Sequence, residues 1–433
     1  MTPQSNFMVL APVASGRLDE LRQVLASMNG LPGNADPDNA LIPFGKFETL
    51  HFARLLVLED KTMGDIEKYG LARIEYPTYF AFLADFDGDR SGFIRELTQK
   101  ANGGLKQIFS HCEGFDANTD LRAWVDAHSV SPATAYINWI GRTSQQVGEE
   151  TELHQTLVNY VGQNWTRLSS MRPFEAQKAI AEYVRAEQQA GRLTLTPEAA
   201  TPLGWKLRNV INLISVPIIL LLLAPFLLIY LPFFLIQLRW HEQHDPDIAP
   251  RIDPAHAHEL AILEDHDVTN QFSAMGSLKP GPFRLWTLTF ILWVIDYTAK
   301  HIYGRGRLAR VSTIHFARWV FLDNKKRLLF ASNYDGSLES YMDDFINKVG
   351  FGLNVVFGNG IGYPRTRFLL LDGAKNEQKF KYVLRRHQLP TEVWYNAHPG
   401  LTAFDRHRNT LIREGLEKSS MTDAEARQWL QLI

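Results

Sequence analysis

The sequence contains two copies of one unit, separated by a long apolar block. Residues 49–54 (TLHFAR) return as residues 313–318 (TIHFAR), and residues 86–88 (FDG) return as residues 334–336 (YDG). Further pairs recur at one constant offset of 259 positions, namely His128, Tyr136, Gly141 and Thr143 against His387, Tyr395, Gly400 and Thr402. This pattern indicates a duplication, and two copies of one fold usually pack about a pseudo-twofold axis.

Each copy mixes strand and helix patterns. In the second copy, residues 314–322 and 327–333 surround a polar turn and predict a hairpin. A helix opens at residues 335–337, because apolar side chains follow it at helical spacing. The remaining expected elements are a helix at 376–387 and a strand at 391–396, and in the first copy strands at 51–58, 79–85 and 134–139 with helices at 91–109 and 121–128. This order predicts an α+β fold with helices on one face of an antiparallel sheet.

The repeats and the apolar block suggest a division of the chain. The expected parts are an N-terminal segment (1–43), a first α+β repeat (44–165), a helical connector (166–208), an apolar membrane segment (209–240), a polar connector (241–283), an interfacial amphipathic segment (284–307), a second α+β repeat (308–420) and a C-terminal helix (421–433).

Composition limits the function classes. The 433 residues have room for roughly two or three domains, and a net charge of −2 argues against a nucleic-acid partner, which favours a basic excess. The single cysteine, Cys112, excludes an intramolecular disulfide and fits a reducing compartment. Residues 1–16 lack the basic start and apolar core of a secretory signal, so we expect a cytoplasmic location.

Residues 210–238 contain no charged side chain and are largely Leu, Ile and Phe. This run exceeds the roughly 20 residues that span a bilayer core, and globular helices are rarely apolar on every face for so long. We therefore expect membrane contact in place of a buried core helix. Pro217, Pro225 and Pro232 disfavour a straight helix, so a kinked span and a helical hairpin that dips in and returns both stay open.

The duplication constrains how this segment meets the membrane. Two repeats that pack together lie on the same side, so the chain crosses the bilayer an even number of times or not at all. Lys206 and Arg208 precede the run and Arg239 follows it, and basic flanks favour the cytoplasmic face. We expect a monotopic anchor on that face, with two crossings as the alternative.

A second apolar stretch, residues 285–295, is too short to span comfortably. It carries Trp286 and Trp293, which are residue types suited to the membrane interface. Basic residues that suit anionic headgroups follow it: Lys300, Arg305, Arg307 and Arg310. The pattern predicts an interfacial helix.

Two ferredoxin-like α+β units in one chain, each with a strand leading to an aromatic-Asp-Gly helix start, resemble the dimeric α+β barrel group that includes dye-decolorising peroxidases and chlorite dismutases. The peroxidases' Gly-x-x-Asp-Gly corresponds to residues 84–88 (ADFDG) and 332–336 (SNYDG), which lack the first Gly. The resemblance implies ferredoxin-like repeats packed as a pseudo-twofold dimeric α+β barrel, and a peroxidase-like site with haem. Residues 315–319 (HFARW) are also similar to segments of uncharacterised bacterial membrane-associated proteins.

The candidate catalytic residues are His315, Arg318, Asp335 and His266. His315 would be a metal or haem ligand or a general base, and Asp335 would be a distal acid of the peroxidase kind. His315, His266 and Asn270 are the candidate cofactor-binding residues. Because His266 and Asn270 are spaced i and i+4, we expect them to share one face of a helical turn just before the interfacial segment.

Residues that occur in both copies also have a structural interpretation. A histidine in both copies is explained by a shared hydrogen bond, and the aspartates by helix N-caps. In a regular strand, each arginine three residues after the histidine lies on the opposite face. The pairs are His51 and His315, Arg54 and Arg318, and Asp87 and Asp335.

Residues found in only one copy are the better functional candidates, because the shared fold does not need them. The connector 241–267 holds His and carboxylate side chains at spacings that can ligate a metal, but also the prolines of a polar juxtamembrane loop, and we assign no metal ligands there. His398, Arg406, His407 and Arg408 form either a basic surface patch or part of a site.

Two function classes remain, since the chain has no Walker A loop, Rossmann glycine fingerprint, zincin helix or Gly-x-Ser-x-Gly elbow. The first is a monotopic membrane protein that handles a lipid or other hydrophobic substrate, in its catalytic form a haem-dependent, peroxidase-like oxidoreductase. The second is a non-catalytic module that binds membrane lipid or docks a partner enzyme.

Overall fold

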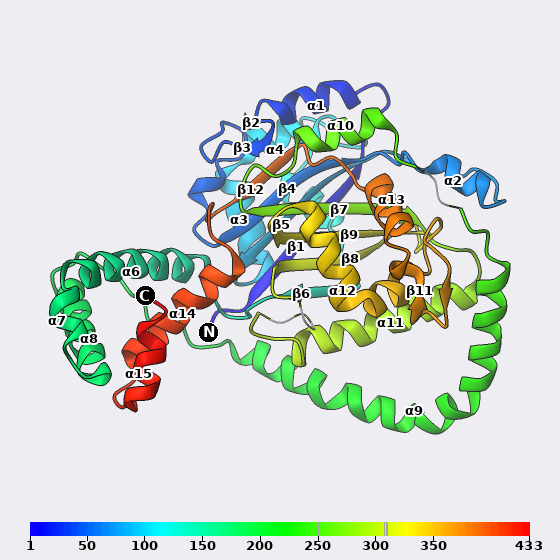
Figure 1. The fold of residues 1–433 in the computed structure, drawn as a ribbon. Coiled ribbons are helices and arrows are strands. Elements are labelled where there is room, and N and C mark those ends of the chain that lie inside the picture. The colour runs from blue at the N-terminus through cyan, green and yellow to red at the C-terminus, as the bar shows by residue number, and fades with distance from the viewer. Residues whose placement is uncertain (249–250, 307, 309–310) are drawn as a thin grey trace.

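Two β-sheets form the centre of the molecule and helices surround them (Figure 1). The computed structural model describes residues 1–248, 251–306, 308 and 311–433. The first sheet has the order β1 (Gln4–Pro12), β5 (Tyr79–Asp87), β4 (Leu50–Leu58), β12 (Val393–Asn396), β3 (Gly33–Ala35) and β2 (Asn29–Leu31). The second has the order β6 (Thr134–Ile137), β8 (Ile314–Leu322), β9 (Arg327–Asp335) and β7 (Thr269–Ser277), and a separate ribbon pairs β10 (Thr366–Arg367) with β11 (Leu371–Asp372). The expected mixed α+β class is confirmed.

The last strand of each copy belongs to the sheet of the other copy. β6 ends the first copy and pairs with β8 of the second, whereas β12 ends the second copy and pairs with β4 of the first. The resulting strand orders match, β1-β5-β4-β12 and β7-β9-β8-β6. β1 and β7 lie in segments that the sequence placed outside the repeats, yet they pair along their lengths with β5 and β9.

The inner faces of the two sheets share one apolar core, and helices cover both outer faces. Along β4, Leu56 and Leu58 pack between the sheets, whereas Leu55 and Val57 pack against helices, as the two-residue period of a strand requires. The helices on the first sheet are α1 (Leu18–Ala26), α3 (Arg90–Lys100), α4 (Asn102–Phe109) and α5 (Leu121–Ala127), and those on the second are α11 (Pro282–His301), α12 (Leu338–Phe357) and α13 (Glu377–His387). The single helix expected at 91–109 is divided into α3 and α4.

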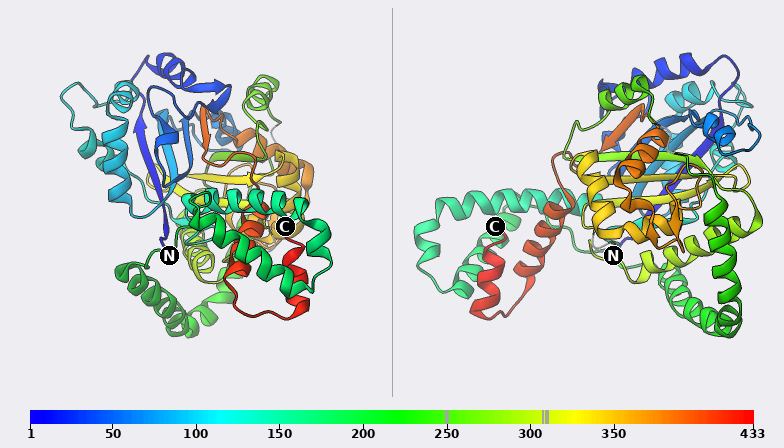
Figure 2. Two further views of the ribbon diagram at one scale, coloured as in Figure 1. Left: turned by 90° about the vertical axis from the view of Figure 1, so that its left-hand side faces the viewer. Right: turned by 45° about the vertical axis from the view of Figure 1, so that its right-hand side comes forward.

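A helical lobe projects from one end of the sheets (Figure 2). Helices of both copies build it, since α6 follows β6 and α14 follows β12 in the chain. Its members are α6 (Ser144–Gln163), α7 (Trp165–Ser169), α8 (Pro173–Gln189), α14 (Ala403–Glu417) and α15 (Asp423–Leu430). Leu153, Leu157, Ile180, Ile412 and Trp429 form its buried core.

Residues that recur at the offset of 259 positions occupy equivalent places. Gly141 and Gly400 have positive φ angles of 97° and 77°, a conformation that glycine adopts most easily. Thr143 and Thr402 then cap α6 and α14, because each side-chain oxygen accepts the amide proton three residues on. The equivalent geometry supports the duplication inferred from the sequence.

The remaining elements lie mostly in connections that differ between the copies. α2 (Met63–Lys68) lies between β4 and β5, where the second copy has only the turn 323–326. Before β7 come α9 (Leu203–His244) and α10 (Pro254–Ile262). Two short 3-10 helices complete the described elements, η1 (Phe44–Lys46) and η2 (Gly373–Lys375).

The helical turn expected around His266 and Asn270 is wrong. α10 ends at Ile262, so His266 lies in a loop, and Asn270 lies in β7 opposite Tyr334 of β9. The sheet ladder satisfies the backbone groups of this segment, whereas a single helical turn would leave most of them without partners.

Candidate functional site

Each repeated histidine is paired with the repeated aspartate of its own copy. Nε2 of His51 lies 2.9 Å from Oδ1 of Asp87, and Nε2 of His315 lies 2.6 Å from Oδ1 of Asp335. The histidines are 3% and 2% exposed. The structure therefore brings two of the predicted site residues, His315 and Asp335, into direct contact, and it repeats this contact in the first copy.

The second carboxylate oxygen of each aspartate accepts an amide proton at the start of a lobe helix. Oδ2 of Asp87 accepts from the backbone of Ser144 at 2.7 Å, and Oδ2 of Asp335 accepts from the backbone of Ala403 at 2.8 Å. The helices that directly follow the aspartates, α3 and α12, have other caps. The aspartates thus stabilise helix N-termini, but those of distant helices.

The charge state of the second pair follows from its surroundings. Burial lowers the pKa of His315, although Asp335 opposes this shift. Burial acts to raise the pKa of Asp335, but His315 and hydrogen bonds from Ala403 and Thr269 bring it below its usual value. At neutral pH the pair is a neutral imidazole beside a carboxylate, an arrangement that fixes the ring orientation.

Both histidines lie at irregularities in the strand pairing. The register of β4 against β5 shifts at His51, and that of β8 against β9 shifts at His315. The centroid of the His51 ring lies 5.6 Å from that of Phe316, and the centroid of the His315 ring lies 5.4 Å from that of Phe52. Each histidine therefore contacts an aromatic ring of the other copy.

The expectation that Arg54 and Arg318 face away from the histidines is wrong. A bulge inserts one residue and interrupts the alternation of faces, so the arginines also contact the other copy. Each donates to two backbone carbonyls there and also to polar side chains. The acceptors of Arg318 are Phe7, Ala84 and the Asp85 carboxylate, and those of Arg54 are Phe272, Ser332, the Ser273 hydroxyl and the Asn333 amide oxygen.

These arginines crosslink the two copies. Arg54 is 4% exposed and Arg318 is 3% exposed. Arg318 is paired with the buried carboxylate of Asp85, whereas Arg54 donates to Asn333, which in turn donates to Asp85. Burial lowers the pKa of Arg54 to about 9, and the charge of Arg318 adds to this effect. Arg318 was a predicted catalytic residue, but its described hydrogen bonds all join the two copies.

His266 and Asn270 do not join this cluster. Nε2 of His266 lies 2.8 Å from the carbonyl oxygen of Ile262, and the ring is exposed. The side-chain amide of Asn270 donates to the carbonyl oxygens of Asp267 and Gly336. Among the described contacts, none links either residue to His315.

The surroundings of His315 do not fit a haem. A haem ligand needs a ring nitrogen that faces an open site. Here Nε2 of His315 is engaged by Asp335, and five cavities among the described residues are lined by none of His315, Arg318, Asp335 and His266. The described residues also contain no group of three or more His, Cys, Asp or Glu side chains placed to hold a metal ion.

Arg406 is not part of a basic surface patch, because it is 3% exposed and lies over the Phe52 ring. Nε2 of His398 lies 2.9 Å from Oγ of Ser144 at the start of α6. Burial lowers the pKa of His398 to about 3, and the charge of Arg406 adds to this effect. His398 is therefore neutral at physiological pH.

α9 forms an arch whose two ends rest on α11 (Figure 1). At its first end, Tyr297 donates a hydrogen bond to the carbonyl oxygen of Leu213 at 3.3 Å. Pro217 has no amide proton, so this carbonyl lacks its normal helical partner. At the second end, the ring centroid of Phe283 lies 5.3 Å from that of Phe234. The helix is continuous through its three prolines, so the apolar run is one bent helix with no hairpin turn.

Length explains the arch. Straight, the 28 residues from Leu213 to His241 would span about 42 Å, whereas their partners on α11, Tyr297 and Phe283, are 14 residues and so about 21 Å apart. Both ends of α9 can contact α11 only if α9 bends, and its three prolines allow this. In the part of the chain that the structure describes, α9 is the one helix long and apolar enough to cross a membrane.

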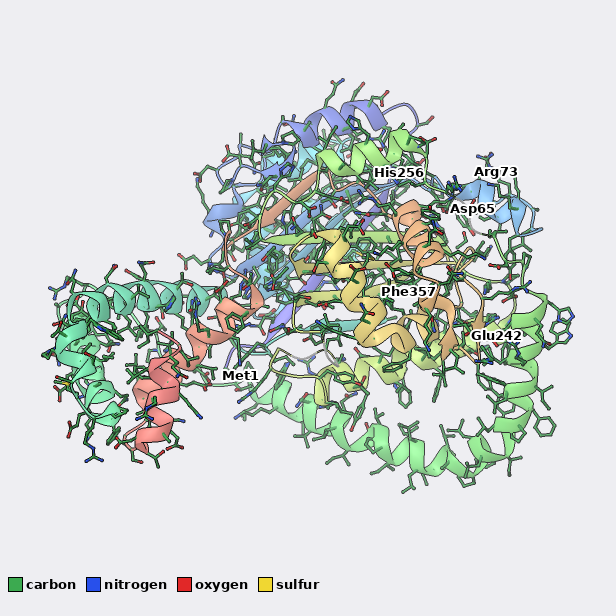
Figure 3. All side chains as sticks on the ribbon, viewed as in Figure 1. Met1, Asp65, Arg73, Glu242, His256 and Phe357 are labelled. Atoms are coloured by element: carbon green, nitrogen blue, oxygen red, sulfur yellow. The ribbon has the colours of Figure 1, made fainter. Side chains whose placement is uncertain are left out.

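A buried ion cluster holds the second end of the arch. Asp245, directly after α9, lies 2.9 Å from Nζ of Lys279 and 2.6 Å from Nη2 of Arg284, and it accepts a hydrogen bond from Tyr69. Glu242, in the last turn of α9 (Figure 3), accepts the backbone protons of residues 368 and 369. Sequence analysis missed this cluster, although charged residues next to both apolar runs were a visible signal.

The interfacial helix expected at 285–295 corresponds to part of α11. One face of this helix is buried and another is exposed. Leu288 and Leu292 are fully buried in the second core, whereas Trp286 is 68% exposed. In the last turn of α11, Lys300 pairs with Asp296, and beyond the helix Arg305 lies over the Trp139 ring. Arg307 and Arg310 lie outside the described residues.

No protein-family model matches the chain, and no curated protein matches it.

Proposed function

We propose that the protein is a monotopic membrane protein, held at the bilayer surface by the arch of α9, and that it binds membrane lipid there. The observation that carries this proposal is the exposure of the arch crest. Leu221, Leu222, Phe226 and Ile229 are 73%, 68%, 71% and 70% exposed, although the helix ends are attached to the body.

Physical chemistry favours a bilayer as the environment of this crest. Burial of a large apolar side chain contributes about 1.5–3 kcal/mol, so a crest of Leu, Ile and Phe is costly in water. Both ends of the arch return to the same body. This supports a helix that enters one leaflet and returns, in preference to a helix that crosses the bilayer. Lys206, Arg208 and Arg239 flank the apolar run and favour the cytoplasmic face.

Lipid binding is preferred here to haem-dependent oxidation. The predicted catalytic residues His315, Asp335 and Arg318 have their polar atoms engaged with each other or with the other copy. The partner-docking alternative has no observation in its favour among the described contacts. A lipid role needs no reactive group, only an apolar surface beside polar groups that suit headgroups.

Sedimentation with phospholipid vesicles tests the anchor. Arginine at the centre of a membrane helix costs about 2.5–3.5 kcal/mol, so L222R/F226R/I229R is expected to remove most vesicle binding. The control, L31R/V158R/W165R, places the same charges at exposed apolar positions outside α9 and is expected to sediment like the unchanged protein. Equal sedimentation of crest variant and unchanged protein would contradict the proposal.

A further inference from the structure

A groove lies beside the second end of the arch, where the two copies differ. Three connections line it: residues 66–76 between β4 and β5, residues 277–285 from β7 into α11, and residues 324–326 between β8 and β9. Its empty volume, which is open to solvent, is about 1030 Å³. The first connection contains α2, which the second copy lacks, so the duplication alone does not produce this groove.

α2 is held over the groove by two polar contacts. Asp65 of α2 accepts hydrogen bonds from the guanidinium of Arg386 at 2.5 and 2.9 Å. Tyr69, just after α2, donates to Asp245 at 2.8 Å. The wall that α2 and the following residues supply is therefore fixed to the second copy and to the end of the arch.

One side of the groove is apolar. It includes Ile66, Leu71 and Ile74 from the first copy and Leu278, Leu285 and Ile361 from the second. Ile74 is 41% exposed, so apolar surface remains open to whatever occupies the groove.

The other side is basic. Lys325 and Lys326 are exposed on the turn between β8 and β9, and Lys279 lies behind them at the end of β7. Lys279 and Arg284 share one carboxylate, Asp245. Burial lowers the pKa of Lys279 to about 8, and the Arg284 charge adds to this effect although Asp245 opposes it.

Buried donors at the groove have unused hydrogen-bonding capacity. Ser277 is 6% exposed and lines the groove, and its Oγ has no hydrogen-bond partner among the described residues. Arg284, in the first turn of α11, does not line the groove, but its Nε and Nη1 are likewise without partners in the described chain. Gly281, the N-cap of α11, supplies no side-chain cap, and oxygens of a phosphate accept hydrogen bonds from such groups.

Side chains of the kind found at membrane interfaces lie next to the groove. Trp286, 68% exposed, follows the groove residue Leu285, and the ammonium group of Lys325 lies 6.0 Å from its ring centroid. Exposed Trp and Lys side chains are typical of the membrane interface. On the other side of α11, the Phe283 ring lies 5.1 Å from that of His241 in α9.

We propose that this groove binds the anionic phosphate headgroup of a membrane phospholipid, with the headgroup at Ser277, Lys325 and Lys326 and one acyl chain against Ile74 and Leu285. The inference rests on the proposed membrane anchoring, because the lipid is drawn from the bilayer that the arch enters. A soluble phosphate would satisfy the basic side but leave the apolar wall in water, so the lipid is the occupant that matches both sides.

Lipid binding is measured with full-length protein in a neutral detergent, with fluorescent phosphatidylglycerol and phosphatidylcholine as probes. Two lysines near an anionic headgroup contribute roughly 1 kcal/mol each, so K325E/K326E is expected to weaken phosphatidylglycerol binding about tenfold or more. Ile74→Asp is expected to weaken binding of both lipids. K178E/R185E on α8 makes the same change of charge far from the groove and is expected to have no effect.

Three results would overturn the assignment: phosphatidylglycerol binding unchanged in K325E/K326E, equal weakening in K178E/R185E, or displacement of the lipid by inorganic phosphate alone. Binding in detergent does not require the arch to enter a bilayer. Loss of vesicle sedimentation with intact detergent binding would therefore contradict the anchor alone, whereas intact sedimentation without detergent binding would contradict the groove alone.

Discussion

The interface between the copies and the groove beside the arch are built in opposite ways. At the interface, the main contacts of one copy have equivalents in the other: Arg318 and Arg54 donate to matching backbone positions, and His315 and His51 bind matching aspartates. At the groove, α2 has no equivalent in the other copy. Residues needed by both copies hold the fold together, and residues present in one copy are the better place to look for function.

The largest expected effect is at the buried arginines. Arg318→Met leaves the Asp85 carboxylate buried without its cation, so it should lower the free energy of unfolding by about 3–5 kcal/mol. Arg54→Met removes contacts to neutral groups only and should cost less. Urea unfolding in detergent measures both, with the exposed Arg95→Met as control. If Arg54→Met lowered the free energy of unfolding as much as Arg318→Met, the loss could not be attributed to the unpaired Asp85 carboxylate.

The histidines test whether the second copy has a special role. His51→Gln and His315→Gln each disturb one buried hydrogen bond, so each should lower the free energy of unfolding by roughly 1–3 kcal/mol. Similar costs, with lipid binding unchanged in both variants, are expected if the histidines serve the fold. If His315→Gln were as stable as the unchanged protein but lost a measurable activity, the conclusion that the interface residues serve only the fold would be wrong.

Acid should weaken the contact between α6 and the second copy. The folded-state pKa of His398 is lowered to about 3, so between that value and about 6.5 the unfolded chain binds a proton that the folded protein does not. Stability is therefore full above about pH 6.5 and declines as the pH falls. After allowance for solvent screening of this half-buried ring, we expect a loss of roughly 1–2 kcal/mol between pH 7 and pH 4.

Unfolding at several pH values measures this loss, and His398→Asn should flatten the pH dependence. An unchanged slope in the variant would assign the acid sensitivity to other groups.

The smallest expected effect is a difference in stability between variants of the two N-caps of the equivalent lobe helices α6 and α14. Thr402 takes part in a capping box with Asp405, whereas Thr143 caps α6 with a single hydrogen bond. Thr402→Ala should cost about 1 kcal/mol and Thr143→Ala somewhat less. Thermal unfolding of both variants side by side resolves the order, and the reverse order would show that the surroundings of α6 outweigh the capping box.

Much of the local structure could be predicted from sequence, because it is encoded in spacing of a few residues. The hairpin of β8 and β9 and the helix α12 match the expected elements, and the apolar run lies in one long helix. The exchange of β6 and β12 could not be predicted, since strands of similar composition pair equally well with either copy. The faces of Arg54 and Arg318 were wrong because a bulge is a tertiary feature of strand pairing.

The candidate site was harder to predict. His315 and Asp335 were expected to be important and they do meet, yet their contact is repeated in the first copy. The groove forms because the connection that contains α2 in one copy lies close to the start of α11 in the other. No local sequence pattern predicts a contact between segments so far apart in the chain.

The exchanged strands also determine the order of events during synthesis. β4 is complete early, but its neighbour β12 is among the last segments to leave the ribosome, so one edge of the first sheet stays open while most of the chain is made. An open edge is a template for incorrect pairing with other chains. The apolar run of α9 emerges before β12. A nascent chain whose α9 has reached a membrane would therefore be bound there before β12 completes the first sheet.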